Sequence, residues 1–125
     1  MKPRDSALRL KRFEATERAR KVASIETMIN DFEHVAADLA RQIAAEEDRT
    51  GIKDPAHFAY STFAKAAGLR RANLLTSVDD LRVKLEAARA EHAEVMAEIG
   101  RLEPIETRDV DRQLRKNDRP GVALG

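Results

Sequence analysis

Two stripes of residues, spaced alternately three and four positions apart, constrain the fold of this chain more than any other feature. The first runs without a break from Leu8 to Ile43 and the second from Tyr60 to Leu102. A 3-4 spacing places every member of a stripe on the helix face that a coiled-coil helix turns toward its partner. Four of the 24 positions are not apolar: Lys11, Arg18, Arg71 and His92. The sequence therefore predicts an all-α chain of two long coiled-coil helices.

Capping signals predict the bounds of the first helix. Asp5 or Ser6 can accept a backbone N–H bond at its start, so we expect a helix over residues 5–48. Gly51 follows the last periodic positions, and glycine commonly ends helices because it adopts a left-handed conformation without strain. A turn is therefore predicted over 49–54.

Two prolines predict the bounds of the second helix. Asp54 can cap a helix and Pro55 suits the first helical position, which needs no N–H partner, so we expect a helix over 55–103. Pro104 is expected to end it. The remainder, residues 104–125, reads as a charged C-terminal tail, either partly disordered or a short helix.

The two stripes can be aligned in opposite directions so that the numbers of facing residues always sum to 103. This register places Ile43 opposite Tyr60 and Lys11 opposite His92, where a polar pair would fix the register. Its midpoint falls inside the predicted turn, although nothing obliges it to. The prediction is one domain over residues 5–103, a long antiparallel two-helix coiled-coil hairpin with both ends of the chain at the same end.

Composition narrows the classes of function. The 23 Lys and Arg residues nearly balance 22 Asp and Glu residues, so the whole chain has no strong field to attract nucleic acid or an anionic membrane. No cysteine is present, which agrees with a reducing compartment, and no stretch reaches the ~20 apolar residues of a membrane span. We expect a cytoplasmic protein.

Residues capable of catalysis or metal binding are scattered. The three histidines, His34, His57 and His92, are far apart and form no zinc pattern. A two-helix protein also offers no water-poor pocket that would shift the pKa of a carboxylate toward catalytic use. The sequence predicts no enzymatic activity, no metal site, no cofactor and no small-molecule substrate.

A basic segment at the N-terminus is the first candidate binding surface. Two apolar residues stand off the stripe among basic ones, and this mixture is more typical of a protein contact than of phosphate binding. A solvated helix face explains the same charges, so both interpretations stay open. The candidate residues are Arg4, Arg9, Leu10, Lys11, Arg12 and Phe13.

Aromatic residues near the turn are the second candidate surface. Phe58, Tyr60 and Phe63 lie within six positions, close to Ile52. They either close the tip of the hairpin, where large side chains are needed, or form an apolar knob that docks into a partner.

Three segments resemble the FliJ family, a small coiled-coil component of the bacterial flagellar protein-export apparatus. They are RDSALRLKRF at 4–13, VASIETMINDFEHVAADLARQIAAEEDRTGI at 22–52 and DPAHFAYSTFAKAA at 54–67, the last with its preceding turn being the most specific. The resemblance covers residues 1–103. This chain is expected to differ from the family in one respect. The family's second helix is usually long, whereas Pro104 is expected to end the second helix of this chain.

The resemblance implies an antiparallel hairpin similar to the stalk subunit of rotary ATPases. It implies that the terminal end enters the pore of a hexameric export ATPase and that another part contacts the cytoplasmic domain of the membrane export gate, with escort of export chaperones as a further role. The expected location is then the cytoplasm, including the inner-membrane gate. The rival hypothesis is a coiled-coil binding module whose basic N-terminal end binds nucleic acid or an anionic surface.

Overall fold

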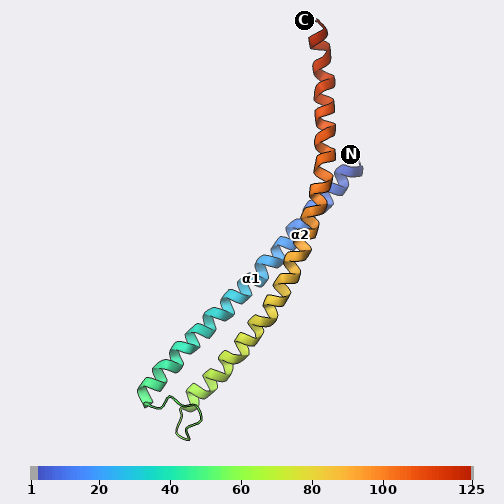
Figure 1. The fold of residues 1–125 in the computed structure, drawn as a ribbon. Coiled ribbons are helices and arrows are strands. Elements are labelled where there is room, and N and C mark those ends of the chain that lie inside the picture. Colours follow the sequence, from blue (N-terminus) through green and yellow to red (C-terminus); the bar gives the residue numbers. More distant parts are fainter. Residues whose placement is uncertain (1–2, 125) are drawn as a thin grey trace. The chain divides into compact units, whose positions relative to one another are not determined.

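Two long helices make up nearly all of the computed structural model, which describes the backbone of residues 3–124 and the side chains of 3–103 and 112–115. Helix α1 spans Pro3–Thr50 and helix α2 spans Thr62–Leu124, joined by a loop (Figure 1). The described residues contain no strand. The all-α prediction is confirmed.

Contacts divide the chain into two units. The terminal unit combines the start of α1, up to Lys21, with α2 from Ala88 onward, and the loop unit comprises Val22–Ala87. In each unit a segment of α1 packs against a segment of α2. In the loop unit, Glu47 near the end of α1 bonds to Tyr60 just before α2, whereas Glu33 bonds to Arg82 further along α2. Both bonds lie within the loop unit.

The predicted stripes form the core of both units. Every stripe position except Arg18 and Arg71 is buried or half-buried, and every buried residue of the described chain belongs to a stripe. Burial of a leucine, isoleucine or valine side chain contributes roughly 1.5–3 kcal/mol, so these residues stabilise the packing most. The buried residues are Leu8, Ala15, Ile25, Ala36, Leu39, Ala64, Ala67, Val78, Leu81, Leu85, Ala88, Val95 and Ile99.

Helix α1 ends at the predicted glycine. Gly51 has a φ of 74°, the left-handed region that favours glycine, and its N–H donates to the carbonyl of Glu47 at 2.8 Å. This single bond is the αL type of helix ending. The loop that follows is longer than the predicted turn at 49–54, because it continues from Gly51 to Ser61.

The prediction that Asp54 and Pro55 start the second helix is wrong. The carbonyl of Asp54 accepts the N–H of His57 at 3.0 Å, and its carboxylate accepts the N–H of Ala56 at 2.9 Å, so these residues form a β-turn. Asp at the first position and Pro at the second also favour a type I turn, and that alternative is the one realised. Ser61 caps α2 instead, since its hydroxyl oxygen accepts the N–H of Ala64 at 3.2 Å.

The longer loop also changes the predicted register. Lys11 bonds to Glu98 at 2.6 Å, about two turns of helix beyond the predicted partner His92. Ile43 lies beside Gly68, not opposite Tyr60, because its terminal methyl would be 4.0 Å from a Cβ added at that glycine. Because α2 starts seven residues later than expected, later residues of α2 face each position of α1.

Helix α2 does not end at Pro104 as predicted. It includes this proline and continues to Leu124, through the segment expected to be a tail. Proline lacks the N–H that bonds to the carbonyl four residues earlier, a cost of about 3 kcal/mol inside a helix. This local cost disfavours a helix at one position without preventing hydrogen bonds on either side of it.

Candidate interaction surfaces

The start of α1 presents two exposed apolar side chains. Leu8 lies in the core of the terminal unit with Ala15, Val95 and Ile99. Leu10 and Phe13, one turn apart on a different face of α1, are 57% and 62% exposed. The structure therefore places this predicted pair at the surface, where it can contact a partner.

Basic residues beside this pair are largely occupied by carboxylates of α2. The Lys11 ammonium lies 2.6 Å from Glu98, and Arg12 lies 3.6 Å from Glu103. A little further along α1, Arg18 and Lys21 lie 3.4 and 3.5 Å from Glu91. Of the other two predicted basic residues, Arg4 is half-buried and Arg9 is exposed. Much of the positive charge of this end is thus compensated within the terminal unit.

The ion pair between Lys11 and Glu98 also shifts the pKa values of both groups. The hydrogen bond to Glu98, helped by one to Glu14, raises the pKa of Lys11 above its ordinary value. The same bond from Lys11 lowers the pKa of Glu98. Each shift favours the charged form of its group, so this pair links α1 to α2 over the neutral pH range.

The three predicted aromatics near the loop have different surroundings. The Tyr60 hydroxyl donates to Glu47 at 2.9 Å, and burial followed by this carboxylate raises the pKa of Tyr60. Phe58 is 95% exposed, with its ring stacked on His57 at 4.7 Å, and Phe63 at the start of α2 is also exposed. Tyr60 therefore closes the loop onto α1, whereas Phe58 and Phe63 are available to a partner.

Polar contacts fix the base of this loop. Glu46 accepts hydrogen bonds from Arg49 at 3.1 Å and from the Ser61 hydroxyl at 3.0 Å. These two bonds lower the pKa of Glu46, with the contribution of Arg49 the larger. Ser61 thus caps α2 and bonds to α1 at once, which determines where the second helix begins.

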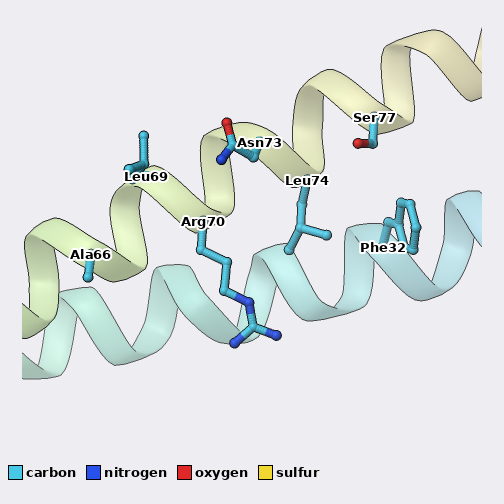
Figure 2. A pocket seen from close by; sticks show the side chains of 7 residues that line it. All are labelled: Phe32, Ala66, Leu69, Arg70, Asn73, Leu74 and Ser77. Carbon is cyan, nitrogen blue, oxygen red and sulfur yellow. The ribbon is translucent and has the colours of Figure 1, made fainter.

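A groove between α1 and α2 in the loop unit was not predicted from the sequence. Its volume is about 380 Å³, and it opens to solvent. In Figure 2, Leu74 of α2 points toward α1, Arg70 extends across toward α1, and Leu69 points away from it. The lining residues are Phe32, Ala66, Leu69, Arg70, Asn73, Leu74 and Ser77. The signal available in the sequence was an apolar residue off the stripe, Leu69, in a stretch of α2 without carboxylates.

In the part of the chain that the structure describes, no three residues of metal-binding type come together. His57 has a local role, since its Nδ1 accepts the N–H of Ala59 at 3.0 Å within the loop.

Comparison with known proteins identified no relative. No protein-family model, no curated protein and no solved structure matches this chain. Within the described residues, neither helix has a stretch apolar enough to cross a membrane.

Proposed function

We propose that this chain is a non-enzymatic component of the bacterial flagellar type III protein-export apparatus. In this role it is an antiparallel two-helix coiled-coil hairpin, a rod that links the hexameric export ATPase to the cytoplasmic domain of the export gate and escorts export chaperones. It then acts in the cytoplasm, at the membrane only through its partners, and is needed for flagellum assembly and motility. It uses no cofactor and binds no small-molecule substrate.

The observation that carries the proposal is the exposed pair Leu10 and Phe13 within a segment that resembles the FliJ family. Buried stripe residues hold α1 against α2, yet these two side chains contribute nothing to that core. Exposed apolar residues beside charged ones are typical of protein interfaces. The resemblance assigns this end of the chain to the ATPase, which supplies a protein surface to cover them.

The course of α2 adds support. The FliJ family usually has a long second helix, and α2 runs through Pro104 to Leu124. The resemblance itself extends over residues 1–103. The segment DPAHFAYSTFAKAA, its most specific part, forms the loop turns and the first residues of α2.

Ion pairs weigh against the rival, in which the basic end binds nucleic acid or an anionic surface. Lys11, Arg12, Arg18 and Lys21 each lie within 4 Å of a glutamate of α2. Phosphates would have to displace these carboxylates. The rival predicts retention on heparin that is lost when Arg9, Lys11 and Arg12 are reversed in charge, with no contact to an ATPase.

Co-purification with the flagellar export ATPase of the same organism tests the proposal. We expect the wild-type chain to bind the hexamer and the double variant Leu10→Asp with Phe13→Asp to lose binding. Val83→Asp is the control, because Val83 is also apolar and 71% exposed but lies in the loop unit. Deletion of the coding sequence should abolish motility; a motile deletion strain would rule out the export role.

A further inference from the structure

The groove of the loop unit is lined by four apolar and three polar residues and opens to solvent. Among the apolar residues, Phe32 of α1 and Leu74 of α2 are half-buried, whereas Leu69 of α2 is 66% exposed. Phe63, exposed one turn before Ala66 on the same side of α2, extends the apolar surface toward the loop. Exposed apolar residues that lie close together mark an interaction site more often than scattered exposed residues do.

The charge of the groove has one sign. Arg70 is the only charged residue among the seven that line it, and none of them is acidic. Residues 62–78 of α2 contain Lys65, Arg70 and Arg71 but no aspartate or glutamate. Among the described residues, Arg70 has no hydrogen-bond or ion-pair partner. Its guanidinium, which extends across the groove in Figure 2, is therefore free to bind a carboxylate.

From these features we infer that the groove binds an acidic amphipathic helix of a protein partner, which adds a third helix to the loop unit. Apolar side chains of that helix, at positions i, i+3 or i+4 and i+7, cover Phe32, Leu69 and Leu74. A carboxylate on its flank meets Arg70. This inference does not rest on the export role, because it follows from the groove alone.

The dimensions of the groove favour a helix as the occupant. Its lining on α2 runs from Ala66 to Ser77, about 16 Å at 1.5 Å per residue. A partner helix of three turns matches this length, and helix-in-groove recognition uses the same spacing of apolar anchors. Recognition of an extended peptide by strand addition would need a sheet edge, and the described residues include no strand.

A second copy of this chain is the less suitable occupant. If two copies packed groove to groove about a two-fold axis, each lining would supply Arg70 and no carboxylate, so like charges would face each other. A partner with acidic residues beside its apolar stripe removes this repulsion and pairs the guanidinium.

Photo-crosslinking of the full chain in its native cells tests this inference. Leu69 is replaced by p-benzoylphenylalanine, and Val83, exposed and apolar but outside the groove, is replaced in the matched control. Crosslinked peptides are identified by mass spectrometry. The segment found is synthesised, and its binding to the purified full chain is measured by fluorescence anisotropy with wild type and with Arg70→Glu.

The expected result is a crosslink at position 69, absent at 83, to an acidic amphipathic segment of another protein. The synthetic peptide should bind roughly tenfold more weakly to Arg70→Glu, because attraction at a partly desolvated pair becomes repulsion. A crosslink to a second copy, to a basic or non-helical segment, or equally at both positions would overturn the inference. So would the absence of any crosslink at 69. Motility of the Leu69 variant is scored separately, so the export role can fail or stand independently.

Discussion

Substitution of the three described glycines by alanine should change stability in opposite directions, although the chemical change is the same. Gly68 lies inside α2, where glycine costs about 0.8–1 kcal/mol relative to alanine. A Cβ there would lie 4.0 Å from the Ile43 terminal methyl, an ordinary contact that adds a few tenths of a kcal/mol of burial. We therefore expect Gly68→Ala to raise the free energy of unfolding by about 1 kcal/mol or slightly more.

Gly100 and Gly51 serve as the controls. A Cβ at Gly100, also inside α2, would meet nothing within 4 Å, so Gly100→Ala should be stabilised by helix propensity alone, about 0.8–1 kcal/mol. Gly51 has a φ of 74°, where an alanine Cβ approaches the following carbonyl oxygen. Gly51→Ala should lose roughly 1 kcal/mol, and Gly51→Asn less, since asparagine tolerates this conformation better.

Urea unfolding followed by circular dichroism at 222 nm measures these changes, and thermal melts provide a second readout. For a chain of this size, 1 kcal/mol corresponds to a shift in Tm of about 3–5 °C. If Gly68→Ala were destabilised while Gly100→Ala was stabilised, α1 would approach α2 more closely at Gly68 than the structure shows. A neutral or stabilised Gly51→Ala would refute the left-handed ending of α1.

Three further predictions concern the core, the start of α2 and the link between the helices. Val78 is the largest fully buried side chain described, so Val78→Ala should cost roughly 2 kcal/mol in urea unfolding. Ser61→Ala should cost about 1 kcal/mol because α2 loses its cap, and hydrogen exchange should increase most in the first turn of α2. The lowered pKa of Glu98 means that its contribution is present above the ordinary value of 4.5 and is lost as pH falls through the lowered one. Glu98→Gln should therefore reduce the loss of stability that occurs as pH falls below 4.5. The same substitution at Glu94, an exposed residue of the same helix, should not reduce that loss.

Several features of the interaction surfaces could be read from the sequence, and others could not. Leu10 and Phe13 stand off the stripe, and periodicity alone places them outside the core. The compensation of Lys11 by Glu98 could not be predicted, because an ion pair between helices depends on their register. The separation of Tyr60 from Phe58 likewise depended on the path of the loop, which brings only the tyrosine to Glu47.

The loop shows why local signals were insufficient for the register. Asp54 followed by Pro55 is compatible with both a helix start and a type I turn, so this local pattern does not decide between them. What distinguishes Ser61 as the cap is a second bond, from its hydroxyl to Glu46 of α1. That bond exists only once α1 and the start of α2 lie side by side, so it is invisible in a single stretch of sequence.

The sequence by itself determined the two helices, the residues that form their common core and the glycine that ends α1. These depend on the 3-4 spacing of apolar residues and on a backbone conformation that only glycine adopts readily, and both are properties of neighbours along one chain segment. The tertiary structure decided which residue of α2 lies opposite each residue of α1, where α2 begins, and which side chains line the groove. Sliding one apolar stripe along another by a heptad again places apolar residues opposite apolar residues, whereas the loop path and individual contacts such as those of Ser61 and Lys11 differ between the alternatives. Only the packed helices supply those contacts.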